Sequence, residues 1–241
     1  DFVKPKSIKF DQVEFKFETS DKKIIQNLNC DIKLGDKIFI QGETGVGKST
    51  FLDIIAGLIK ITQGKITINN QENYNFLSGV FNQSYVSQFP FLYNSSLIEN
   101  IALKNTISEK EINLIKSISQ ILLLEDVIKT DEDYHRSIGD YGNKLSGGQK
   151  QRICIARALF KKPDILILDE SLNAVNQEKR RKIIENIISL NKNQIFLYVS
   201  HDKADMINFN KHFLFEKNKI ALKKLTYFFD KKYVKNYNIK N

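Results

Sequence analysis

The sequence predicts an α/β fold in which a mostly parallel sheet is flanked by helices. Strand-like and helix-like patterns alternate along the second half of the chain, which is typical of parallel sheets. The runs "DILILDE" (164–170) and "QIFLYVSHD" (194–202) are almost continuously apolar, as expected of strands that are covered on both faces. A third observation is a glycine-rich loop that joins a predicted strand to a predicted helix near residue 45.

The first half of the chain contains three predicted strands and one predicted helix. Apolar and polar residues alternate over 8–17, on either side of a break, and strand patterns also cover 37–42 and 64–70. Between the last two strands, "TFLDIIAGLI" (50–59) has apolar residues at helical spacing, including Leu58. This segment is therefore predicted to be a helix.

The middle of the chain is predicted to be mostly helical. Helical patterns cover 96–103, 108–124 and 147–160, and Ser108 with Glu111 forms the sequence signature of a capping box. Pro163 ends this region, and a further amphipathic helix is expected over 176–190. We therefore expect one domain over residues 1–241: a core of about 1–87 and 163–212, an inserted helical subdomain of about 88–162, and a C-terminal tail of about 213–241.

The composition is that of an ordinary globular chain, with 41% hydrophobic and 27% charged residues among 241. The net charge of +9 would suit nucleic acid, an anionic membrane face or nucleotide phosphate, and by itself does not choose between them. Cys30 and Cys154 lie among apolar neighbours, which favours buried free thiols over a disulfide. No apolar run is as long as a membrane span, and no secretory signal begins the chain.

The loop "GETGVGKS" (42–49) matches the phosphate-binding pattern G-x-x-x-x-G-K-[ST] in the strand–loop–helix context that the pattern requires. Its glycines allow the backbone to wrap around phosphates, and its lysine charge reaches the β and γ phosphates. Its serine hydroxyl can ligate Mg²⁺. The residues expected to bind nucleotide are Gly42, Glu43, Thr44, Gly45, Val46, Gly47, Lys48, Ser49 and Thr50.

Two acidic residues end the apolar strand at 165–169. In open α/β sheets, ligands bind at the carboxyl edge of the strands, where these carboxylates would lie. Asp169 is expected to hold Mg²⁺, directly or through water, and Glu170 to act as a general base on the attacking water. Alone, the pair would more often be a solvated acidic turn, but the phosphate loop upstream favours the catalytic interpretation.

The stretch "LSGGQKQRICIARAL" (145–159), just before "ILILDE", resembles the signature of the ATP-binding cassette (ABC) ATPases, and the resemblance covers residues from about 8 to 210. It implies a nucleotide-binding core of the P-loop type, an N-terminal antiparallel β subdomain and an inserted helical signature subdomain. It also implies that two copies enclose two ATP–Mg²⁺ head to tail. The signature residues expected to bind the partner's γ-phosphate are Ser146, Gly147 and Gly148.

Three further residues match the family one by one. Gln88 resembles the glutamine that senses Mg²⁺ and contacts the membrane domain, with an ordinary surface glutamine as the alternative. His201 resembles the switch histidine at the γ-phosphate, which is expected to assist Glu170 and Lys48 in catalysis. Phe17 lies where the family keeps an aromatic residue that stacks on adenine, although it could equally be a plain strand residue.

The chain departs from the family pattern after Glu170. The family usually has a Ser-Ala-Leu-Asp type segment there, and this chain has Asn173, Ala174, Val175 and Asn176. An amide therefore replaces the acid that helps to couple the two ATP sites. We expect hydrolysis to survive because Glu170 is intact, whereas the coupling between the sites is open to question.

Two stretches resemble exporter-type members of the family: "FPFLYNSSLIENIAL" (89–103) and "IGDYGNKLSGGQ" (138–149), in which Asp140 stands where Glu is usual. The expected function is therefore ATP hydrolysis that drives export through transmembrane domains, at the cytoplasmic face of the cell membrane and with no nucleic acid partner. Because the chain begins with Asp rather than Met, we expect those domains to be fused N-terminally, with a separate subunit as the near alternative. The more distant alternative is a soluble ABC ATPase of the repair or translation type.

Overall fold

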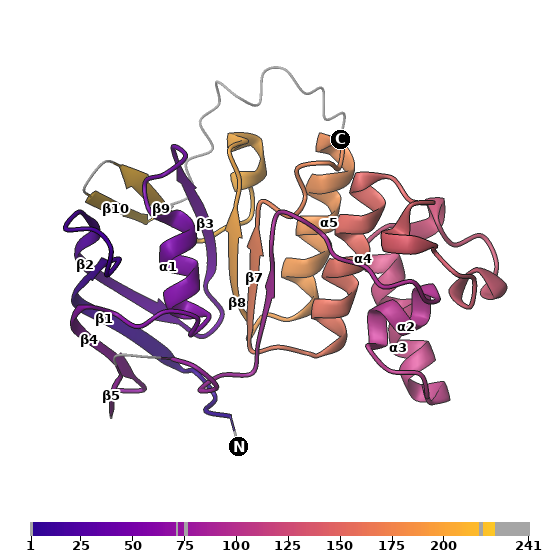
Figure 1. Cartoon of the computed structure of the whole chain (residues 1–241), viewed down its shortest axis with the longest axis horizontal. Coiled ribbons are helices and arrows are strands. Elements are labelled where there is room, and N and C mark those ends of the chain that lie inside the picture. Colours follow the sequence, from indigo (N-terminus) through magenta and orange to yellow (C-terminus); the bar gives the residue numbers. More distant parts are fainter. Residues whose placement is uncertain (1, 71, 75–76, 217–218, 225–241) are drawn as a thin grey trace, which may run out of the picture.

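The computed structural model describes residues 2–70, 72–74, 77–216 and 219–224 and arranges them around two sheets (Figure 1). The larger sheet has the strand order β10-β9-β3-β8-β7-β6. Its neighbours from β9 to β6 are parallel, and β10 pairs antiparallel with β9. These strands are β3 (Lys37–Gly42), β6 (Gln83–Val86), β7 (Ile165–Asp169), β8 (Ile195–Val199), β9 (Lys211–Glu216) and β10 (Lys219–Lys224). The predicted mostly parallel sheet is confirmed.

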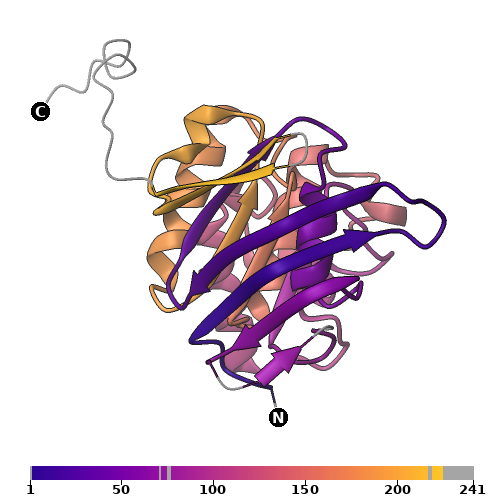
Figure 2. The same ribbon diagram turned by 90° about the vertical axis from the view of Figure 1, so that its left-hand side faces the viewer.

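The smaller sheet is antiparallel, with the order β2-β1-β4-β5, and it faces the viewer in Figure 2. Its strands are β1 (Ser7–Lys16), β2 (Lys23–Lys33), β4 (Gln63–Ile68) and β5 (Glu72–Tyr74). The break expected in the pattern of β1 is an irregularity at Gln12, whose φ is 49°, and the pairing with β2 shifts between Phe10 and Val13. The antiparallel β subdomain expected from the family resemblance is therefore present.

The predicted helices form, and side chains cap the starts of all of them except the first. The helices are α1 (Lys48–Ile55), α2 (Leu97–Ala102), α3 (Glu109–Ile121), α4 (Gly147–Phe160) and α5 (Gln177–Leu190). At the start of α3, the Glu111 carboxylate accepts hydrogen bonds from the Ser108 N–H at 3.0 Å and the Ser108 hydroxyl at 2.9 Å. At the start of α5, Asn176 Oδ1 accepts from the Lys179 N–H at 2.9 Å. Asn176 thus serves as an N-cap, a position that Asn and Asp fill equally well.

Helix α1 ends earlier than its apolar periodicity predicts. Its last residue is Ile55, and Leu58 is 63% exposed instead of buried on the helix. Gly57 has φ +65°, and a Cβ there would lie 2.4 Å from the backbone nitrogen of Ser78. A glycine in the left-handed conformation terminates a helix and brings the last carbonyl groups of the helix within reach of new partners. The left-handed Gly57 therefore ends α1, and the close approach of Ser78 leaves no room for a side chain at this position.

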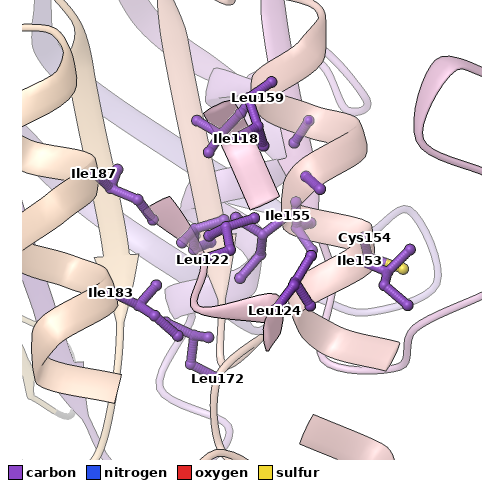
Figure 3. Packing of buried hydrophobic residues seen from close by; sticks show 14 of the residues in the cluster. Ile118, Leu122, Leu124, Ile153, Cys154, Ile155, Leu159, Leu172, Ile183 and Ile187 are labelled. Atoms are coloured by element: carbon purple, nitrogen blue, oxygen red, sulfur yellow. The ribbon is translucent and has the colours of Figure 1, made fainter. Parts of the chain in front are cut away.

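The core lies on both faces of the larger sheet. Phe39, Leu166 and Tyr198 belong to the cluster that α4 and α5 cover, whereas Ile38 and Ile167 point to the opposite cluster, which also contains residues of α1 and the antiparallel sheet. Figure 3 shows how Ile155, Ile183 and Leu172 converge in the first cluster. Because neighbouring residues of each central strand are buried on opposite faces, those strands are apolar throughout.

Helices α2 and α3 lie at the end of the molecule away from the antiparallel sheet (Figure 1). They contact α4, and α4 in turn contacts β6 and β7 of the large sheet. The helical segment expected over 88–162 is therefore joined to the sheet through α4. The "LSGGQ" motif at the start of α4 is thus linked to the strand that ends at Asp169, because α4 packs on β7.

The structure corrects the prediction of a C-terminal tail that begins at about residue 213. Residues 211–216 form β9, which pairs in parallel with β3, and 219–224 form β10. The short "HFLF" pattern owes its strand conformation to the free edge of β3, a tertiary contact that local periodicity does not reveal. The remainder of the expected tail, 225–241, lies outside the described residues. Among the helices that the structure describes, none has the length and apolarity to cross a membrane.

Candidate active site

The phosphate loop joins β3 to α1 at the carboxyl edge of the large sheet. Gly47 forms the N-cap of α1 with φ +101°, and no side chain caps the helix. The first turn of α1 also carries no acidic residue. Its backbone N–H groups and helix dipole are therefore suited to an anionic ligand such as phosphate.

Lys48 is buried, with 7% of its surface exposed, and its ammonium faces the loop backbone. Its Nζ donates hydrogen bonds to the carbonyl oxygens of Gly42 and Glu43, each at 2.8 Å. Burial lowers the pKa of Lys48, and the charges of Glu170 and Asp169 oppose that shift. Lys48 thus places a positive charge in the loop, where the predicted binding of phosphate requires one.

Asp169 ends β7 and accepts hydrogen bonds from two neighbouring elements. The Tyr85 hydroxyl, on the adjacent strand β6, donates to its Oδ2 at 2.9 Å, and the Ser49 hydroxyl of α1 also donates to it. Burial raises the pKa of the Asp169 carboxyl, whereas both hydrogen bonds favour the ionised form. Ser49 and Asp169, which the sequence predicts to hold Mg²⁺, therefore lie in direct contact. Hydroxyl and carboxylate oxygens are the ligands that Mg²⁺ prefers.

Glu170 follows β7 in the left-handed conformation, with φ 50°. Its carboxylate is held at both oxygens: Oε1 lies 2.9 Å from Nε2 of His201, and Oε2 accepts a 3.0 Å hydrogen bond from the Asn173 side-chain amide. The structure thus brings together the predicted general base and the predicted switch histidine from two neighbouring strands.

A buried polar network fixes the segment that follows β8 and carries His201. Asp205 is 1% exposed and accepts hydrogen bonds from Tyr198, Ser200 and Arg180, at 2.9, 2.8 and 2.9 Å. Burial lowers the pKa of Arg180. Asp205 and the neighbouring charges raise this pKa by a larger amount, so that the net shift is upward. Because the chain turns around this network directly after His201, the network sets where the histidine lies.

The signature segment begins α4 and packs on the loop that follows Glu170. Ser146 and Gln149 form a reciprocal cap, in which Ser146 Oγ accepts from the Gln149 N–H at 3.3 Å and Gln149 Oε1 accepts from the Ser146 N–H at 2.8 Å. A Cβ on Gly148 would lie 2.7 Å from the carbonyl oxygen of Ala174, which leaves no room for a side chain. Gln151 Oε1 accepts a 3.0 Å hydrogen bond from the Ala174 N–H. The second glycine of the signature is therefore also a packing requirement.

Phe17 and Gln88 lie outside the contacts described above. Phe17 follows β1, is 47% exposed, and meets Phe15 edge to face at 5.0 Å between ring centroids. Gln88 is exposed in the loop after β6. Both side chains are accessible to a ligand, and their roles at adenine and at Mg²⁺ stay predictions.

Comparison with known proteins shows which family the chain belongs to. The family model described as "ABC transporter" matches residues 25–173, which is more than half of the chain. The chain belongs to the ABC transporter family. The domain of that family is an ATPase that binds ATP, generally with Mg²⁺.

Several relatives of this ABC domain are named as export or transport proteins. It is 34% identical over 91% of its length to the multidrug resistance-like ATP-binding protein MdlA of Buchnera aphidicola, and 31% identical over 88% to the ATP-dependent lipid A-core flippase of Pasteurella multocida. Among solved structures, a bacterial Atm1-family ABC exporter with ATP bound matches 92% of the chain at 25% identity, with a TM-score of 0.78. The chain spans 40%, 37% and 38% of the lengths of these three proteins. It is an ABC ATPase domain, similar to the ATPase portions of exporter-type proteins.

Sequence reasoning missed the contacts that hold the two acidic residues. Tyr85 was not singled out, although it donates to Asp169, and Asn173 was noted only as a departure from the family pattern. Strand β6 has the sequence QSYV, so the tyrosine does not stand out among its polar neighbours. Its partner lies 84 positions away along the chain, so that only strand pairing reveals the contact.

Proposed function

We propose that this ABC domain hydrolyses ATP in a head-to-tail dimer and thereby drives export of a substrate through transmembrane domains. The observation that carries the proposal is the contact between Glu170 and His201 at 2.9 Å, on the same sheet edge as Lys48 and Asp169. This arrangement combines a carboxylate base, a second polar group and a phosphate-binding cation, which are the parts that phosphoryl transfer to water requires.

ATP binding is assigned to the phosphate loop and to Phe17. The N–H groups at the start of α1 and the Lys48 ammonium would hold the phosphates, while the exposed ring of Phe17 would stack on adenine. Ser49 and Asp169 would hold Mg²⁺, and Gln88 would join them. When bound, Mg²⁺ offsets negative charge on the phosphates.

Hydrolysis is assigned to Glu170 and His201. Glu170 would accept a proton from the attacking water, because its carboxylate oxygens retain lone pairs beyond those used by His201 and Asn173. His201 is half exposed, so that its ring can also reach the terminal phosphate of a bound nucleotide. Lys48 would stabilise the charge that develops on that phosphate.

Dimer formation is supported by the signature segment. Ser146 and Gly147 are exposed at the start of α4, where the helix dipole and N–H groups suit a second anion. Each copy would then supply a phosphate loop to one ATP and a signature to the other. A single copy would hold two half-sites.

A groove beside the Gln88 loop is the candidate contact for the transmembrane domains. Its volume is about 240 Å³, and it lies between helix α4 and strand β6 with the segment that follows this strand. Phe89 at its rim is 80% exposed, and Arg157 and Lys161 add positive charge. An exposed aromatic rim of this kind is typical of protein–protein contacts. Further relatives are named as putative export ATP-binding/permease proteins, which favours a membrane domain as the occupant.

The decisive experiment compares nucleotide-dependent association of three variants. Glu170→Gln should bind ATP–Mg²⁺, lose turnover by at least about 100-fold, and accumulate as a dimer in size-exclusion chromatography with light scattering. Adding Ser146→Arg to that background should leave a monomer with unchanged ATP affinity, whereas Lys48→Ala should abolish tight ATP binding. Unchanged turnover of Glu170→Gln would refute the general base. Loss of ATP binding in the Ser146→Arg variant would show that the signature acts on its own chain's nucleotide.

A further inference from the structure

The loop between β7 and α5 holds one side chain on the proposed general base. Asn173 Nδ2 donates a 3.0 Å hydrogen bond to Glu170 Oε2, the oxygen that His201 does not contact. A carboxylate held at one oxygen can still rotate about its last bond, whereas donors at both oxygens fix its plane. Asn173 therefore supplies the second of two contacts that orient this carboxylate.

The backbone of Asn173 is itself fixed from both sides. Leu172 is fully buried before it, and Val175 is 6% exposed after it. The next residue, Ala174, donates its N–H to Gln151 Oε1 at 3.0 Å and packs against Gly148 of the signature. The Asn173 side chain is exposed and fills no space in the core. The loop is thus anchored independently of the Asn173 side chain, which remains available to act on Glu170.

We infer that Asn173 is a positioning residue for ATP hydrolysis: it orients the Glu170 carboxylate and binds neither nucleotide nor metal. The inference rests on the proposed role of Glu170 as the general base. Orientation of the reacting group contributes to rate and not to substrate affinity, because the carboxylate acts on water and not on the phosphates. Asn173 consequently affects kcat and leaves KM for ATP unchanged.

The residue type at position 173 matters because the side chain must be long enough to contact the Glu170 carboxylate. The amide nitrogen of Asn is one bond further from the backbone than the hydroxyl of Ser, so Ser would fall short by about 1.5 Å. A gap of that size leaves the 3.0 Å contact broken. Asp would keep the length of the side chain but would place a second negative charge beside Glu170. Gln retains the amide donor on a longer side chain.

The test measures steady-state ATPase kinetics of the purified chain. Asn173→Ser should lower kcat about tenfold with KM changed by less than about twofold, and Asn173→Asp should lower kcat further. Asn173→Gln should keep kcat within about threefold of the original value. The matched control is Asn105→Ser, an exposed loop asparagine away from the site, which should leave both parameters unchanged. An unchanged kcat for Asn173→Ser, or a higher KM at the same kcat, would overturn the inference.

A double variant separates positioning from any independent role. Because Asn173 acts through Glu170, adding Asn173→Ser to Glu170→Gln should cause no further loss in single-turnover rate. A further tenfold loss would show that Asn173 acts elsewhere and would reject the inference while leaving the general base intact. If Glu170→Gln itself kept its turnover, the proposed function would fail, and the positioning role would fail with it.

Discussion

The Tyr85 hydroxyl donates a 2.9 Å hydrogen bond to Oδ2 of Asp169, across the paired strands β6 and β7. Asp169 thereby has a partner on the groove side of the sheet and, through Ser49, a second partner on the phosphate loop. Residues that contact a metal ligand from behind fix its orientation, and their loss typically reduces metal affinity by about 10–100-fold.

Tyr85→Phe removes the hydroxyl and keeps the ring. We expect the Mg²⁺ concentration for half-maximal ATPase activity to rise about tenfold, because the Asp169 carboxylate loses a donor that holds it in place. The measurement is ATPase rate against Mg²⁺ at saturating ATP. Tyr141→Phe, which changes an exposed tyrosine in the same way, should leave the curve unchanged. An unaltered Mg²⁺ dependence in Tyr85→Phe would mean that the contact does not orient Asp169.

Gly148→Ala should destabilise the domain, since its Cβ would lie 2.7 Å from the Ala174 carbonyl oxygen. Overpacking against backbone costs about 1–3 kcal/mol, and the melting temperature should fall accordingly. Gly147→Ala is the matched comparison, because its Cβ would meet the Ala174 side chain at 3.4 Å, an ordinary contact. Equal melting temperatures for the two variants would show that the loop yields without cost. Differential scanning calorimetry makes the comparison directly.

Glu111→Gln tests the cap of α3 through its pH dependence. Hydrogen bonds from Lys104 and from Ser108 lower the pKa of the Glu111 carboxyl from 4.5 to about 2. A carboxyl with a lowered pKa in the folded state adds stability above its unfolded pKa, and this contribution is lost as the pH falls from about 4.5 to about 2. The variant should therefore have a lower melting temperature than the original chain at pH 7. The difference should shrink below pH 4.5. A difference independent of pH would exclude the carboxylate charge as the cause, and Glu109→Gln controls for charge in the same helical turn.

Much of the fold could be read from local pattern because the relevant forces are local. The runs at 165–168 and 195–199 are apolar throughout, since both faces of β7 and β8 are buried, and this leaves a clear signal in the sequence. Ser108 and Glu111 predict the start of α3 because a capping box forms within one turn. Strand β9 lacked such a signal, because it depends on pairing with the edge of β3.

In the candidate site, too, some features could be predicted from local sequence and others could not. The phosphate loop, the two acidic residues at the end of β7 and the signature could be predicted from the sequence alone, because each is a contiguous motif whose spacing its chemistry dictates. Their family assignment was confirmed by the match over residues 25–173. The end of α1 at Ile55 was missed, because the apolar periodicity continues past Gly57, whose left-handed conformation ends the helix.

The sequence by itself determined the family, the order of the elements and the residue types able to bind phosphate and metal. Only the tertiary structure decided which groups hold Asp169 and Glu170 in place. Tyr85, Asn173 and His201 reach these carboxylates across neighbouring strands or around a left-handed turn. Such contacts depend on strand order and loop geometry, which arise when the whole sheet is packed. No local period or motif encodes them.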